Sequence, residues 1–62
     1  MPIIQIELLE GRTIEQKRKM IKGVTDVISE TLNCKPETVH IIIREMKREN
    51  FAKNGILFSE ME

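Results

Sequence analysis

The chain has 62 residues with ten basic and ten acidic side chains, and this balance removes the long-range positive field on which non-specific nucleic-acid binding depends. One cysteine, Cys34, and one histidine, His40, are too few for a disulfide or a structural zinc site. We therefore expect a single domain, residues 1–62, with no nucleic-acid partner, metal or cofactor.

Size and hydropathy bear on assembly and location. A chain this short buries only ~60% of the surface that it exposes when unfolded, so oligomerisation is the expected means of stabilisation. Apolar runs do not exceed three residues, which excludes a transmembrane helix and a signal-peptide core. With a lone unpaired thiol, this predicts a cytoplasmic protein that has no membrane partner.

The first predicted element is a strand over residues 3–9. This segment is rich in β-branched side chains, and Ile4, Ile6 and Leu8 recur at period two on one side. The turn at residues 10–12 ends the strand.

A helix is predicted from Thr13 to about Leu32. Thr13 and Gln16 have the spacing of a capping box, in which each side chain bonds the other residue's backbone N–H. Asn33 is a candidate left-handed cap, and Pro36 prevents continuation. The apolar stripe of this helix, which needs a sheet to cover, comprises Met20, Ile21, Val24, Val27, Ile28 and Leu32.

A second strand is predicted over residues 39–46. Its three consecutive isoleucines put apolar groups on both faces, so burial of both faces is expected. The order strand, helix, strand predicts an α+β chain built on one βαβ unit with two parallel strands. Since one helix covers one sheet face, the face that carries Ile42 must be covered by another subunit. Residues 47–54 read as a polar loop, and residues 56–58 as part of a short C-terminal hairpin or tail.

The start of the chain is the first candidate for catalysis. Methionine before a small residue is commonly removed, and loss of Met1 would expose the secondary amine of Pro2. An α-amino group has a pKa of about 7.7–8.0, and desolvation lowers it, which suits a general base. Many chains begin Met-Pro without catalytic reason, and if Met1 stays the nitrogen is an amide.

Two other side chains, Cys34 and His40, could have either a structural or a chemical role. Cys34 lies in a turn without a charged relay nearby in the sequence, so a buried or half-buried, unreactive thiol is expected. His40 alternates with Ile42 and Arg44 on one strand face, and is either hydrogen-bonded at a subunit interface or part of a site.

Taken together, several segments resemble the 4-oxalocrotonate tautomerase family, in register from Pro2 to about Ser59. They are Pro2-Ile3-Ile4-Gln5-Ile6, Leu9-Glu10-Gly11-Arg12-Thr13, Glu15-Gln16-Lys17, Ile42-Ile43, Glu45-Met46 and Phe51. The resemblance implies a tautomerase-like βαβ subunit, assembled as a homohexamer of three dimers, with a dimer as the fallback.

The resemblance also implies site roles. Pro2 would be the general base that moves a proton on a small unsaturated 2-hydroxy or 2-keto acid such as 2-hydroxymuconate. Arg12 matches an arginine that binds a substrate carboxylate, a task that suits the guanidinium fork. Phe51 matches an aromatic residue of the apolar wall, and interface packing is its alternative role.

Two positions depart from the family pattern. His40 stands where the best-studied members have a second arginine that binds substrate and stabilises the enolate oxygen, and loss of one such donor costs on the order of 3 kcal/mol. Lys53 stands where related hydratases and dehalogenases have a carboxylate, which disfavours water addition here. His40 and the presence of Met1 motivate the runner-up hypothesis, which is a non-catalytic oligomeric module that binds a small ligand on the same scaffold.

Overall fold

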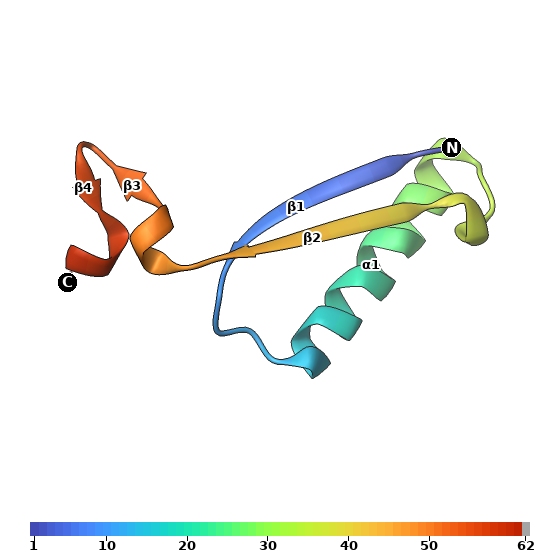
Figure 1. Ribbon diagram of the computed structural model, residues 1–62. Helices are drawn as coiled ribbons and strands as arrows, with labels where there is room; N and C mark the ends of the chain where they lie inside the picture. The colour runs from blue at the N-terminus through green and yellow to red at the C-terminus, as the bar shows by residue number, and fades with distance from the viewer. Residues whose placement is uncertain (62) are drawn as a thin grey trace.

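Two parallel strands and one crossover helix form the main body of the chain (Figure 1). The computed structural model describes residues 1–61. β1 (Ile3–Leu9) pairs in parallel with β2 (His40–Met46), from Ile3 opposite His40 to Leu9 opposite Met46, and α1 (Ile14–Leu32) connects them. The predicted α+β fold with a βαβ unit is confirmed.

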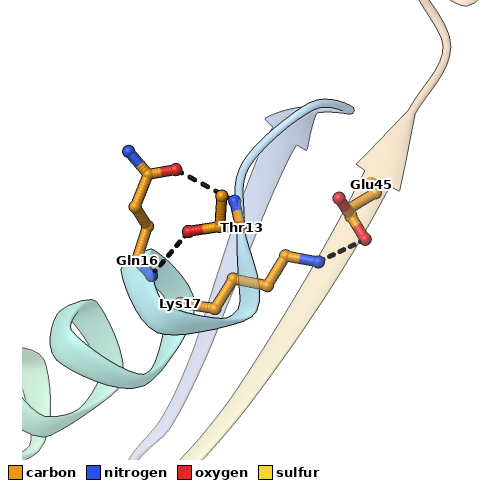
Figure 2. A network of polar contacts seen from close by, with 4 residues as sticks. All are labelled: Thr13, Gln16, Lys17 and Glu45. Atoms are coloured by element: carbon orange, nitrogen blue, oxygen red, sulfur yellow. Dashed lines mark hydrogen bonds and ion pairs between the residues drawn. The ribbon is translucent and has the colours of Figure 1, made fainter.

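Local sequence signals set both ends of α1. The capping box is formed: the Thr13 N–H donates to Gln16 Oε1 at 2.9 Å, and the Gln16 N–H donates to Thr13 Oγ1 at 3.1 Å (Figure 2). At the other end Asn33 adopts the left-handed conformation at φ 53°, and its N–H donates to Ser29 O. Pro36 then opens a 3₁₀ turn, Pro36–Thr38.

β2 begins at His40, one residue later than the sequence predicts. The reason is local, because the N–H of Val39 closes the preceding 3₁₀ turn by donating to Pro36 O at 3.1 Å. Val39 is therefore unavailable for strand pairing.

One face of the sheet lies against α1. Ile4, Ile6, Ile41 and Ile43 are half-buried on this face, as period-two alternation predicts. Lys17 of α1 reaches across to it, and its Nζ donates to Glu45 Oε1 at 2.6 Å (Figure 2). The helix is thus tied to the second strand by an ion pair as well as by apolar contact.

The opposite sheet face is open in the single chain. Ile3 on β1 is 57% exposed and Ile42 on β2 is 41% exposed. The single helix covers only one side, as the sequence predicts, and burial of the second side by another subunit remains a prediction. Among residues 1–61 none is fully buried.

The sheet covers only part of the predicted apolar stripe of α1. Met20, Val24 and Ile28 are half-buried, whereas Val27 and Leu32 are about 60% exposed, at 59% and 60%. Adjacent strands lie only ~4.8 Å apart, so a two-stranded sheet cannot cover a broad helical stripe. The outer part of the stripe is left without cover in one copy.

The last fifteen described residues, 47–61, form a C-terminal arm that projects from the far end of the sheet (Figure 1). Within the arm, β3 (Ala52–Lys53) and β4 (Ile56–Leu57) form an antiparallel hairpin. Asn54 and Gly55 both have positive φ, 54° and 77°, which the two-residue turn of such a hairpin requires. The predicted short hairpin is confirmed, and the chain is elongated, with extents of 43 × 23 × 14 Å.

Candidate active site

Pro2 and His40 lie together at the start of the two strands. The N–H of His40 donates to Pro2 O at 3.0 Å, one residue ahead of the first paired position of β1. Pro2 is half-buried, whereas Met1 before it is 82% exposed. The main chain therefore fixes Pro2 at the end of the strand and leaves Met1 exposed to solvent.

The ring of His40 has one nitrogen engaged and one available. Its Nδ1 lies 3.1 Å from Thr38 O. Because a carbonyl oxygen only accepts hydrogen bonds, Nδ1 carries the hydrogen in this contact. Nε2 of the exposed ring then has a lone pair when the imidazole is neutral, and an N–H only when it is the imidazolium.

Arg12 lies beyond the other end of β1. Gly11 before it has φ 116°, a conformation that lets the chain turn sharply out of the strand. The N–H of Glu10 donates to Met46 O at 2.9 Å, so the two strands end together. Arg12 is exposed and lines a hollow beside the start of α1 with Leu8, Gln16, Lys17 and Met20.

Phe51 belongs to the C-terminal arm, where it contacts a second aromatic ring. The rings of Phe51 and Phe58 meet edge to face, with centroids 5.7 Å apart and planes inclined at 65°. The guanidinium carbon of Arg48 lies 5.2 Å from the centroid of Phe58. Arg48 and Phe58 also line a second hollow, together with residues 7–12.

The four residues that the sequence nominates thus fall into two groups within one copy. Pro2 and His40 lie at the start of the strands, and Arg12 and Phe51 lie beyond their ends. The seven residues of β1 separate the groups, which corresponds to ~20 Å along a strand. No single copy brings Pro2 and Arg12 into one pocket, so a site that uses both draws them from different copies.

The salt bridges of residues 1–61 leave some cations without a carboxylate partner. On the open sheet face Arg44 Nη1 pairs with Glu7 Oε2 at 2.9 Å. Other pairs join Lys17 with Glu45, Arg18 with Glu15, and Lys22 with Asp26. Neither Arg12 nor Arg48 takes part in a salt bridge within the described part of the chain.

Arg48 and Phe58 are site candidates that the sequence reading does not identify. The segment that holds Arg48 reads as a polar loop, and its position over Phe58 depends on the arm folding back so that the Phe58 N–H donates to Phe51 O at 2.7 Å. The spacing of residues in the sequence contains no signal for the contact between Arg48 and Phe58. Only the folded structure reveals it.

Neither Cys34 nor a cluster of metal-ligating side chains forms a further candidate site in residues 1–61. The backbone of Cys34 is held by Ser29, whose Oγ donates to Cys34 O at 2.6 Å, and the thiol is free and half-buried. In residues 1–61 no group of three or more His, Cys, Asp or Glu side chains is placed to hold a metal ion. Over the same residues, no helix has the length and apolar character needed to cross a membrane.

Comparison with known proteins identifies the family. The family model described as "Tautomerase enzyme" matches residues 2–61. The 2-hydroxymuconate tautomerase of Bacillus subtilis is 39% identical over 62 residues, which cover 100% of both chains.

Solved structures agree with this result. The crystal structure of a 4-oxalocrotonate tautomerase homologue superimposes with a TM-score of 0.93 at 37% identity, over 100% of this chain and 98% of the other. A heterohexameric 4-oxalocrotonate tautomerase from Chloroflexus aurantiacus gives a TM-score of 0.93 at 26% identity, with both chains fully covered. The chain therefore belongs to the tautomerase family of isomerases, as the resemblance in its sequence predicts.

Proposed function

We propose that the chain catalyses keto–enol tautomerisation of a small unsaturated 2-hydroxy or 2-keto acid, with the amine of Pro2 as the general base once Met1 is removed. The observation that carries this proposal is the position of Pro2. Its carbonyl is fixed by the His40 N–H at 3.0 Å, so the ring is held at the strand end with its nitrogen at the terminus of the processed chain.

The proton transfer needs one group that is basic and then acidic. The lone pair of the Pro2 nitrogen takes the proton of the enol hydroxyl, and the oxygen electrons form the carbonyl bond as the conjugated double bonds shift. The same nitrogen then returns the proton to a carbon of the conjugated chain. The similarity to a 2-hydroxymuconate tautomerase supports a 2-hydroxymuconate-like substrate.

Arg12 and Phe51 would complete the pocket from another copy of the chain. Arg12 would bind a substrate carboxylate through its guanidinium fork, and Phe51 would form part of the apolar wall. We propose a homohexamer built from three dimers, with a dimer as the smaller alternative. The exposed Ile3 and Ile42 and the outer stripe of α1 support self-association, because each needs cover.

His40 would contact the substrate beside the base. With Nδ1 engaged by Thr38 O, only Nε2 is free to meet an enolate or carboxylate oxygen. It donates a hydrogen bond to such an oxygen in the imidazolium form and opposes it with a lone pair in the neutral form. His40 would therefore be a weaker oxyanion partner than the arginine that the family resemblance places there.

The second candidate is a non-catalytic oligomeric module that binds a small ligand on the same scaffold. Two observations favour it: His40 in place of an arginine, and Met1, which while attached makes the Pro2 nitrogen an amide with no basic lone pair.

Comparison of turnover with binding separates the two candidates. We would measure ketonisation of 2-hydroxymuconate and phenylenolpyruvate by protein shown by mass spectrometry to lack Met1. Pro2→Ala should lower kcat by about 100-fold or more, since general-base catalysis contributes roughly 10²–10⁴. The matched variant Pro36→Ala, in the 3₁₀ turn, should keep the wild-type rate. Full activity in Pro2→Ala, or no turnover by the processed wild type, would overturn the proposal.

A further inference from the structure

Two arginines, Arg12 and Arg48, line the hollow beyond the end of β1. Residues 7–12 line it from the first strand and its turn, and Arg48 and Phe58 line it from the C-terminal arm. The bond from the Glu10 N–H to Met46 O makes both strands leave the sheet at this point. Arg12 and Arg48 each follow within two residues of that bond.

Arg48 is held in a way that leaves its hydrogen-bond donors available. Its guanidinium carbon is 5.2 Å from the centroid of Phe58, which is consistent with a cation–π contact. Phe58 is itself fixed by the edge-to-face contact with Phe51 and by its N–H bond to Phe51 O at 2.7 Å. A cation–π contact uses the charge of the guanidinium and does not pair its N–H groups with an acceptor oxygen.

The charges around the hollow favour an anion. Two carboxylates line it, Glu7 and Glu10, but Glu7 is already paired with Arg44 at 2.9 Å. Among residues 1–61 neither Arg12 nor Arg48 has a carboxylate within salt-bridge distance. Within residues 1–61, the lining of the hollow therefore has two arginines and one carboxylate, Glu10, that take part in no salt bridge.

We propose that Arg48 acts with Arg12 to bind the carboxylate of the substrate that is remote from the enol, so that the enzyme selects dicarboxylates over monocarboxylates. This rests on the proposed tautomerase function, which places the enol at Pro2 of another copy. A carboxylate between two guanidinium groups receives several charge-assisted hydrogen bonds, and a phenyl ring in the same place receives none. The arm thereby supplies a second guanidinium for the remote carboxylate.

The test compares a diacid with a monoacid. For Arg48→Gln we expect KM for 2-hydroxymuconate to rise about tenfold or more, because the variant loses charge-assisted hydrogen bonds to the remote carboxylate. Its kcat should stay within about twofold, since a remote contact is made equally in the ground and transition states. KM for phenylenolpyruvate, which has no second carboxylate, should be unchanged.

Two variants control for folding and for charge. Arg48→Lys keeps the charge but not the planar fork, and should recover part of the lost affinity. Arg18→Gln removes an arginine that pairs with Glu15 on the exposed side of α1, and should leave both KM values unchanged. If Arg48→Gln changes KM equally for the diacid and the monoacid, or changes neither, Arg48 only packs on Phe58 and the proposal is wrong.

Direct binding separates failure of this proposal from failure of the tautomerase function. Calorimetry would compare muconate, a six-carbon dienoic diacid without the hydroxyl, with sorbate, the corresponding monoacid. Muconate should bind wild type about tenfold more tightly than Arg48→Gln, whereas sorbate should not distinguish them. This result would support the site even if turnover were absent. Equal muconate affinity, or no muconate binding by wild type, would refute it whatever the turnover.

Discussion

The backbone N–H of His40 donates to the carbonyl oxygen of Pro2 at 3.0 Å, so pairing of the two strands starts at the proposed base. The carbonyl is held while the nitrogen belongs to the peptide bond with Met1. Removal of Met1 would therefore change the chemistry of Pro2 without disturbing the hydrogen bond that positions it.

Activity should depend on the processed fraction of the protein. With Met1 attached, the Pro2 nitrogen has no basic lone pair, so a preparation that retains Met1 throughout should show about 1% or less of the processed rate. Mass spectrometry of mixtures with known processed fractions, assayed on 2-hydroxymuconate, checks this. A rate that does not follow the processed fraction would contradict the assignment of the base.

Replacing His40 by arginine should raise activity on the diacid. A guanidinium always donates, whereas neutral His40, with Nδ1 bonded to Thr38 O, presents a lone pair at Nε2. We expect kcat/KM for 2-hydroxymuconate to rise about tenfold or more, within the range that one oxyanion donor contributes. His40→Ala is the control, and its kcat/KM for 2-hydroxymuconate should not rise. An unchanged or lower value for His40→Arg would show that the ring does not meet the developing oxyanion.

The capping box should contribute measurably to stability. Thr13→Ala removes the side chain that accepts from the Gln16 N–H at 3.1 Å, and loss of such a cap costs about 1 kcal/mol. Urea denaturation at one fixed protein concentration measures the loss, because unfolding of an oligomer depends on concentration.

Thr31→Ala is the matched control for this measurement. Its hydroxyl donates to Val27 O at 2.7 Å within the helix, a contact that slightly destabilises helices. This variant should therefore be neutral or slightly stabilising. Equal losses in Thr13→Ala and Thr31→Ala would show that the cap makes no special contribution.

The open sheet face should be essential for assembly. Ile42 is 41% exposed in one copy, and Ile42→Glu would put a charge where we propose that another copy packs. Light scattering at micromolar concentration should show loss of the oligomer, with circular dichroism showing partial or complete unfolding. Lys19→Glu, on the exposed surface of α1, should assemble normally. An intact oligomer in Ile42→Glu would place the interface elsewhere.

Much of the fold is predictable because its signals are local. Thr13 with Gln16 sets the helix start, Asn33 and Pro36 set its end, and period-two alternation sets which strand residues are half-buried. Each of these features depends on neighbours within four residues, so the local sequence is enough to predict it.

Other features depend on distant parts of the chain, so local patterns do not predict them. The exposure of Leu32 follows from the width of the sheet beneath α1, which no helical periodicity reveals. Arg48 reaches Phe58 only because the arm folds back on itself. Of the site, the sequence nominates Pro2 and Arg12, but their separation by the length of β1 follows from the topology.

The separation of Pro2 and Arg12 along β1 has a genetic consequence. In the proposed assembly each copy would contribute its Pro2 amine to one pocket and its Arg12 guanidinium to another, so a defect at either residue would not be confined to a single pocket. Two chains with different defects could still form one intact pocket between them. After gene duplication, one descendant could keep the amine and the other the guanidinium, which makes division of labour between paralogues accessible to this architecture.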